Sequence, residues 1–259
     1  MQDGFVATSH GRIHFIEAGE GAPLILLHSN GGSGHQFLEV MKILSRERRV
    51  IAWDMPGHGD SDPISRHHSV PDYADAVVSM MDRLGIERAD IAGSSIGGSV
   101  SVALGARHGG RVRRLIPVET PVRTQEDWAG SWTATEMAFG TVSQTEAQVQ
   151  PRVRNLTAAM LTRWNIDRAK AGVKTMIDVM WAIRQYDAVA DMPRITPPTL
   201  VIFGGNGSLL GKADMMRELI PRCAVAIADG CGHFPMMDDP EGFAAMVSAF
   251  LNDPGIGGP

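Results

Sequence analysis

Short apolar runs alternate with helical stretches along most of this chain, and that alternation limits the folds open to it. Residues 24–27 and 50–53 carry no charged side chain, as expected of central strands that are covered on both faces. Residues 70–84 repeat apolar side chains at helical spacing. Strands and helices that alternate at such short intervals form right-handed βαβ units, so the sequence predicts an α/β fold with a mostly parallel sheet.

The other expected elements extend this scheme over the 259 residues. Strands are expected at 4–8, 12–18, 89–92, 113–118, 199–203 and 224–228, and helices at 35–44, 96–106, 212–220 and 240–251. Residues 121–191 contain four of the five tryptophans but no strand-like run, so we expect several helices there. The expected organisation is a core of residues 1–120 and 192–259 with a helical insertion at 121–191. A Gly- and Pro-rich tail at 252–259 is expected to fray.

Composition narrows the classes of function. A net charge of -5 argues against a nucleic-acid partner, because phosphate binding needs concentrated Lys and Arg, and the basic clusters at 46–49 and 111–114 fit solvated faces. No apolar run approaches the roughly 20 residues of a membrane span. Residues 1–10 lack the layout of a signal peptide. We expect a cytoplasmic protein that acts on a small molecule, and the sequence does not define its oligomeric state.

Cysteine and histidine usage predicts neither a disulfide nor a metal site. Two cysteines, Cys223 and Cys231, are expected to be reduced thiols in a chain of this size. Neither stands at a metal-ligand spacing from a histidine. We therefore expect no metal and no cofactor.

Ser95 lies at the centre of a Gly-x-Ser-x-Gly sequence, GSSIG at residues 93–97. An expected strand precedes it and an expected helix follows it. This order is typical of a sharp, strained turn that exposes the serine hydroxyl, where glycines on either side avoid collisions with the neighbouring strand and helix. Ser95 is therefore a candidate nucleophile. A Gly-rich turn without a catalytic role is the alternative interpretation.

Four sequence motifs, taken in order, resemble those of the α/β-hydrolase superfamily. They are HSNGGSG at 28–34, DMPGHGDSD at 54–62, GSSIGG at 93–98 and GCGHFP at 230–235. The resemblance implies an eight-stranded, mostly parallel sheet with a helical cap inserted after the sixth strand. It also implies a catalytic triad in the chain order serine, acid, histidine.

The resemblance assigns His233 as the general base that serves Ser95. His233 follows the last expected strand and precedes the final helix, so its loop can carry an imidazole over the serine. A neutral imidazole suits this task because its unperturbed pKa of about 6.5 lies close to working pH. His58, in the Pro-Gly-His-Gly turn, is expected to be structural.

The triad acid departs from the commonest pattern of the superfamily. In most members it follows the seventh strand in a Gly-x-x-Asp turn, where this chain has Gly207, and the next carboxylate is Asp214. Some haloalkane dehalogenases and zearalenone-type lactonases carry it after the sixth strand instead, where Glu119 stands. We therefore predict that Glu119 orients His233. The alternative for Glu119 is a surface salt bridge to Arg114 or Arg123.

The oxyanion site needs two N–H donors aimed at the developing charge. The resemblance assigns the backbone N–H groups of Ile96 and Asn30, the second in the loop after the third strand. Ser29 stands where the superfamily usually has glycine. The alternative is that residues 31–34 form only a flexible connection.

These assignments predict acyl transfer to water. A serine at position 95 excludes dehalogenase chemistry, which uses a carboxylate nucleophile at this place. Hydrolysis of a carboxylic ester or lactone of an apolar small molecule through an acyl-enzyme fits best. Hydrolysis of a carbon–carbon bond in a ring-cleavage product and non-catalytic ligand binding are the alternatives.

The helical insertion is expected to form the substrate pocket. Its aromatic residues predict an apolar lining made by Trp128, Trp132, Trp164 and Trp181. The alternative is that most of these side chains only pack the insertion onto the core.

Overall fold

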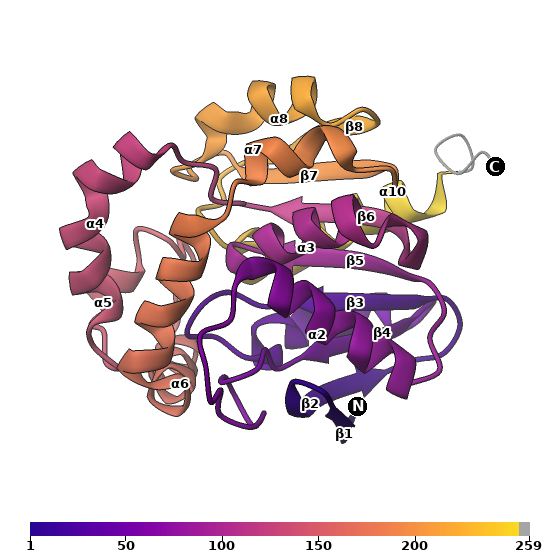
Figure 1. Cartoon of the computed structure of the whole chain (residues 1–259), viewed down its shortest axis with the longest axis horizontal. Coiled ribbons are helices and arrows are strands. Elements are labelled where there is room, and N and C mark those ends of the chain that lie inside the picture. Colours follow the sequence, from indigo (N-terminus) through magenta and orange to yellow (C-terminus); the bar gives the residue numbers. More distant parts are fainter. Residues whose placement is uncertain (254–259) are drawn as a thin grey trace.

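A single eight-stranded sheet runs through the computed structural model, which describes residues 1–253 (Figure 1). Its spatial order is β1-β2-β4-β3-β5-β6-β7-β8. β1 and β2 are antiparallel to their neighbours, whereas all pairs from β4 to β8 are parallel. The strands are β1 (Gln2–Thr8), β2 (Gly11–Ala18), β3 (Pro23–Leu27), β4 (Arg49–Trp53), β5 (Ala89–Ser94), β6 (Val112–Val118), β7 (Thr199–Gly204) and β8 (Cys223–Ala228). The predicted fold class is confirmed.

Helices cover both faces of the sheet. The α-helices outside residues 121–187 are α1 (Leu38–Leu44), α2 (Val70–Arg83), α3 (Ile96–Arg107), α7 (Ala188–Asp191), α8 (Ala213–Leu219), α9 (Pro235–Asp238) and α10 (Pro240–Asn252). Short 3-10 turns occur at Gly34–Phe37, Gly109–Arg111, Met192–Arg194 and Leu210–Lys212. The expected helix at 35–44 is therefore a 3-10 turn followed by α1, because Phe37 leaves the helical region with φ -108° and ψ 5°. Residues 254–259, most of the tail expected to fray, lie outside the described residues.

Two apolar layers form the core because strand side chains alternate between the faces. Leu24 and Leu26 of β3 pack in one layer with α1 and α10. Ile25 and Leu27 pack in the other with α2, α3 and α8. All four side chains are fully buried, which explains why β3 is a continuous apolar run.

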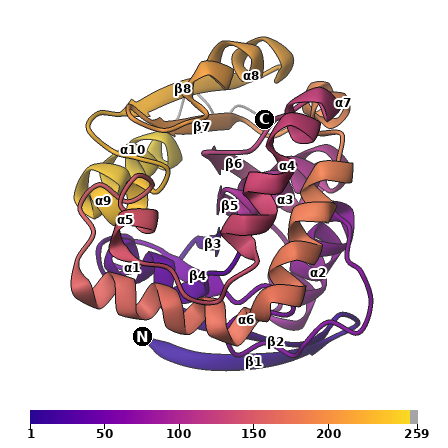
Figure 2. The same cartoon turned by 90° about the vertical axis from the view of Figure 1, so that its left-hand side faces the viewer.

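The first three helices after β6 are α4 (Gln125–Phe139), α5 (Glu146–Val149) and α6 (Ala158–Gln185). We call them the α4–α6 segment. It lies on the left in Figure 1, and in Figure 2 it surrounds the ends of β3, β5 and β6. α6 is interrupted at Gly172, whose φ of 75° and ψ of 156° are not helical. The next helix, α7, already packs against α3 of the core.

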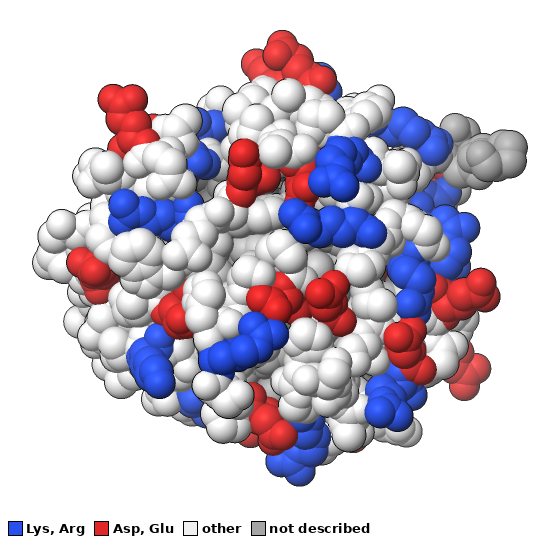
Figure 3. All heavy atoms as spheres, viewed as in Figure 1, with Lys and Arg blue, Asp and Glu red and all other residues white. Residues whose placement is uncertain are grey.

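Charged side chains are mixed on the surface. On the face seen in Figure 3, acidic and basic groups are interspersed over the helices and loops. Within residues 1–253, no helix combines the length and the apolar character needed to cross a bilayer. Cys223 and Cys231 both carry free thiols, as predicted.

Candidate active site

Ser95 occupies the turn between β5 and α3 with φ 56° and ψ -114°. A Cβ on Gly93 would come within 2.0 Å of the Gly97 carbonyl oxygen, and a Cβ on Gly97 within 2.1 Å of the Leu27 carbonyl oxygen. Both glycines are therefore required for the close approach of the turn to its neighbours. The Ser95 N–H donates to the Val118 carbonyl at 2.9 Å. This bond secures the strained turn to β6.

His233 and Glu119 meet although 114 residues separate them. The distance between His233 Nδ1 and Glu119 Oε2 is 3.0 Å. The second carboxylate oxygen of Glu119 accepts the Gly204 N–H at 2.8 Å. Glu119 is fully buried and has a φ of 45°. Neither arginine considered above pairs with it, since Arg114 donates to the Asp253 carbonyl and Arg123 to Ser131.

Gly207 leaves room for the Glu119 carboxylate. A Cβ at position 207 would lie 1.9 Å from Glu119 Oε1. The Glu119 carboxylate therefore occupies the space that a side chain at position 207 would need. Asp214, the next carboxylate along the chain, lies on α8 with its side chain 85% exposed and pairs with Arg217 at 2.7 Å.

Hydrogen bonds hold the loop that carries Asn30. Asn30 Nδ2 donates to the Met176 carbonyl at 2.8 Å, and Asn30 Oδ1 lies 3.2 Å from His58 Nε2. The Ser29 N–H donates to Gln36 Oε1 at 2.9 Å. This loop is thus a braced turn and not a flexible connection.

The backbone donors assigned to the oxyanion site are free. Within residues 1–253, no hydrogen bond uses the N–H of Asn30 or of Ile96. Ile96 is the first residue of α3, where a helix leaves its N–H groups without internal partners and carries positive partial charge. Asn30 lines the same cavity as Ser95, and Ile96 directly follows Ser95 in the chain.

His58 supports this loop as a neutral ring. Burial, with the charge of nearby His28, lowers the pKa of His58 to about 3. At neutral pH its Nε2 can therefore carry a proton toward Asn30 Oδ1. This placement agrees with the structural role expected from the sequence.

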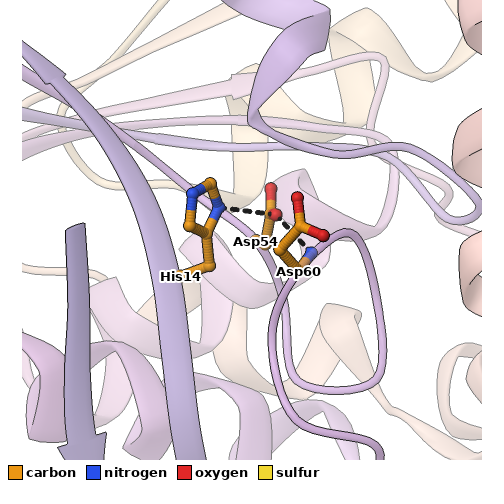
Figure 4. A group of neighbouring side chains, drawn as sticks. All are labelled: His14, Asp54 and Asp60. Atoms are coloured by element: carbon orange, nitrogen blue, oxygen red, sulfur yellow. Dashed lines mark hydrogen bonds and ion pairs between the residues drawn. The ribbon is translucent and has the colours of Figure 1, made fainter. Parts of the chain in front are cut away.

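His14, Asp54 and Asp60 form a polar cluster (Figure 4) that contacts the Asn30 loop at Gly34. Asp54 Oδ2 accepts from His14 Nδ1 and from the Asp60 N–H, both at 2.8 Å, and Asp54 Oδ1 accepts from the Gly34 N–H at 2.7 Å. Burial raises the pKa of Asp54, but these hydrogen bonds outweigh it and lower the pKa to about 2. Both carboxylate oxygens of Asp54 therefore accept hydrogen bonds, and these bonds connect the loop at residues 28–34 with the loop at residues 54–62.

Ser95 and His233 line a common cavity of about 300 Å³. The α4–α6 segment supplies most of the remaining wall, including Trp128 and Phe139. Arg152, which the sequence did not single out, also lines it. No motif marks Arg152, so only the packing of the segment identifies it.

The four tryptophans do not share one pocket, which corrects the sequence expectation. Trp128 lines the cavity that contains Ser95 and His233, whereas Trp164 lines a second cavity of about 310 Å³. Ser29 lines both cavities. Trp132 and Trp181 are absent from both linings, and their rings are in tilted contact with centroids 4.4 Å apart. Trp132 packs against the apolar core, whereas Trp181 is 38% exposed. Helical spacing does not reveal which face a neighbouring element covers.

Comparisons with known proteins find similar sequences and a similar fold. The chain is 28% identical to a 2-hydroxymuconate semialdehyde hydrolase from Pseudomonas sp. (strain CF600), over 93% of this chain and 90% of the relative. It is 27% identical to a pimeloyl-[acyl-carrier protein] methyl ester esterase from Neisseria meningitidis serogroup A / serotype 4A (strain DSM 15465 / Z2491), over 87% and 75%. The crystal structure of the enol-lactonase from Burkholderia xenovorans LB400 shares the fold, with a TM-score of 0.82 at 22% identity over 96% and 100% of the two chains.

A sequence profile settles the family. The profile described as "Alpha/beta hydrolase family" matches residues 24–246, a range that contains Asn30, Ser95, Ile96, Glu119 and His233. The matched region ends within α10. The chain therefore belongs to the alpha/beta hydrolase family and is a hydrolase.

Proposed function

We propose that this hydrolase cleaves a carboxylic ester or lactone through an acyl-enzyme, with Ser95, His233 and Glu119 as the triad. The observation that carries the proposal is that His233, which is hydrogen-bonded to the buried Glu119, lines one cavity together with Ser95. Glu119 holds Nδ1, which leaves Nε2 of His233 as the ring nitrogen that can face Ser95. The acid after β6 is the layout in which the chain resembles zearalenone-type lactonases.

The reaction has two steps. Ser95 Oγ attacks the carbonyl carbon while His233 Nε2 takes the hydroxyl proton, and the Asn30 and Ile96 N–H groups stabilise the oxyanion. Collapse breaks the bond to the alcohol oxygen, which receives the proton from His233. Water, deprotonated by His233, then attacks the acyl carbon and releases the carboxylic acid and Ser95.

We propose that residues 121–191 form a cap and that residues 1–120 and 192–259 form the core that carries the triad. The cap supplies Trp128 and Phe139 to the cavity wall but no member of the triad. Its contacts should therefore decide which substrate fits.

Hydrolysis of 4-nitrophenyl acetate tests the proposal. The purified protein should release 4-nitrophenolate, and Ser95→Ala should not exceed the buffer rate. A rapid burst of about one equivalent would show the acyl-enzyme directly. Equal rates for the two proteins would contradict the assignment of Ser95.

A second candidate function is hydrolysis of a carbon–carbon bond. The relatives that favour it are two 2-hydroxymuconate semialdehyde hydrolases and a 2-hydroxy-6-oxo-2,4-heptadienoate hydrolase, at 26–28% identity over more than 90% of this chain. The test is to follow loss of the coloured ring-cleavage product 2-hydroxymuconate semialdehyde. A kcat/KM for it well above that for every ester and lactone tested would favour this second function.

A further inference from the structure

The cavity that contains Ser95 and His233 has a positive lining in a chain that is acidic overall. Apart from His233, its charged lining residues within the described part of the chain are Arg123 and Arg152, and no aspartate or glutamate lines it. The whole chain carries a net charge of -5. Two cations in a concave site therefore focus a positive potential where the substrate must bind.

The side chain of Arg152 is held in place by neutral groups. Its Nη2 donates to Gln144 Oε1 at 2.9 Å, and its guanidinium carbon lies 4.9 Å from the centre of the Trp164 ring. Trp164 Nε1 donates to the same Gln144 oxygen at 2.9 Å. This arrangement orients the guanidinium without neutralising its charge.

Arg152 also lies next to the loop of the catalytic histidine. A Cβ on Gly232, the residue before His233, would come within 2.6 Å of the Arg152 carbonyl oxygen. The Gly232 N–H donates to Asp238 Oδ2 at 2.7 Å, and Asp238 Oδ1 accepts from the Asn155 N–H at 3.0 Å. The chain around Arg152 is therefore fixed to the His233 loop.

The guanidinium of Arg152 has no counter-ion. Within residues 1–253 it forms no ion pair, and its Nε and Nη1 make no hydrogen bond. Burial alone lowers the pKa of Arg152 to about 10, so the group remains a cation at neutral pH. Partial burial of a cation without a counter-ion is costly, and an anion that enters the cavity would reduce that cost.

Other cations in the neighbourhood have partners or a structural task. Lys170 pairs with Asp60 at 2.7 Å. Arg168 donates from Nη2 to the carbonyl oxygens of Ala138 and Thr141 at the end of α4, both at 2.6 Å. Arg123 lies at the exposed rim near Asp127. Nε and Nη1 of the buried Arg168 also lack hydrogen-bond partners, but Arg168 does not line the cavity that contains Ser95, so Arg152 is the less exposed of the two arginines that a substrate there can reach.

We propose that Arg152 forms a carboxylate subsite and that the natural substrate is a small ester or lactone that carries a free carboxylate. The proposal rests on the proposed function, because it places the carboxylate in the same cavity as the bond to be cleaved. Arg123 adds long-range attraction at the rim. A guanidinium suits a carboxylate because its N–H groups donate charge-assisted hydrogen bonds.

Two esters of equal chain length test the subsite. The 4-nitrophenyl monoester of adipic acid carries a distal carboxylate, and 4-nitrophenyl hexanoate carries a methyl group there. The wild-type protein should prefer the adipate ester in kcat/KM after subtraction of the buffer rate. Arg152→Gln should reduce the ratio of the two kcat/KM values by about 10- to 100-fold, as expected for loss of a hydrogen bond between charged groups. Arg152→Lys should retain part of the preference.

Arg154→Gln is the matched control. It removes the same charge two residues away, from an exposed side chain that does not line the cavity. It should leave the ratio unchanged. A similar fall of the ratio in Arg154→Gln would overturn the subsite, because it would show an effect of net charge alone.

Binding of adipate to Ser95→Ala protein, measured by calorimetry, separates the subsite from the catalytic proposal. Adipate should bind Ser95→Ala and bind at least tenfold more weakly to Ser95→Ala/Arg152→Gln. If no ester is cleaved but this difference is found, the proposed function fails and the subsite stands. If esters are cleaved without preference for the carboxylate and adipate does not bind, the subsite is overturned and the proposed function stands. Tighter Arg152-dependent binding of inorganic phosphate than of adipate would overturn the choice of carboxylate.

Discussion

The loops at the carboxyl ends of the strands and the α4–α6 segment hold their polar side chains in different ways. In the loops, buried carboxylates accept backbone N–H groups, as Glu119 does from Gly204 and Asp54 from Gly34. In the segment, Arg168 is bonded to the backbone in a similar way, but other arginines stack on aromatic rings, as Arg184 does on Trp132 and Trp181. Buried charge-assisted bonds to the backbone fix a geometry, whereas partly exposed stacking contacts can rearrange at little cost. We therefore expect the loops to be rigid enough for the chemical step and the α4–α6 segment to select the substrate.

The comparison predicts its largest effect for the pair Ser95 and His233. Ser95→Ala and His233→Ala should each reduce kcat by about 10⁶-fold, because the hydroxyl and the imidazole act as one unit. The double variant should be little slower than either single variant. Steady-state rates of the three proteins on one ester give the answer, and additive losses would show that the two residues work independently.

Glu119 should have the next largest effect. Glu119→Gln keeps the size of the side chain but cannot stabilise the imidazolium, so kcat should fall by a factor on the order of 10³ to 10⁴. Asp214→Asn is the control, since Asp214 is exposed on α8 and pairs with Arg217. Near-normal turnover by Glu119→Gln together with an inactive Asp214→Asn would show that the triad acid is Asp214, after β7, and not Glu119.

Gly207 offers a test of rigidity without a change in chemistry. Gly207→Ala places a methyl group where the Glu119 carboxylate lies. The displaced carboxylate should misalign His233 and reduce kcat by about 10²-fold. Gly211→Ala, with nothing within 4 Å of the new methyl group, should turn over normally. If both variants kept the wild-type kcat, the loops would be less rigid than proposed.

Changes in the α4–α6 segment should have smaller effects that depend on the substrate. Trp128→Ala enlarges the cavity and should change the ratio of kcat/KM between a large and a small ester by about tenfold. Trp181→Ala, outside the cavity lining, should leave that ratio within about twofold. Equal scaling of all substrates by Trp128→Ala would contradict a role in selection.

The smallest effect concerns the stability of the loops at low pH. Because the pKa of His58 is lowered to about 3 in the folded protein, only the unfolded chain binds this proton between about pH 6.5 and pH 3. The stability that neutral His58 provides is therefore full above pH 6.5 and is lost as the pH falls toward 3. Melting temperatures at pH 7.5, 6.0 and 4.5 should decline, and His58→Gln should decline less over the same range. Equal declines would assign the effect to other groups.

Much of the site could be predicted from the sequence because its residues lie in local motifs. The strained turn at Ser95 and the loops that carry Asn30 and His233 each occupy a short stretch with its own glycines. The role of Glu119 was harder to predict, since it was inferred from the position of this residue at the end of a strand and from the absence of a carboxylate at position 207. Arg152 escaped prediction because a lone arginine in a helical insertion carries no local signal of burial or of a missing partner.

The sequence by itself determined the order of strands and helices, because periodic burial and backbone hydrogen bonding act over a few neighbouring residues. Only the tertiary structure decided which side chains meet across long separations. It brought Glu119 to His233, filled the space beside Gly207, left Trp181 on the outer surface and left Arg152 in the cavity without an acid. Such pairings depend on how the α4–α6 segment packs on the core, since contacts between distant residues form only when the whole chain is folded.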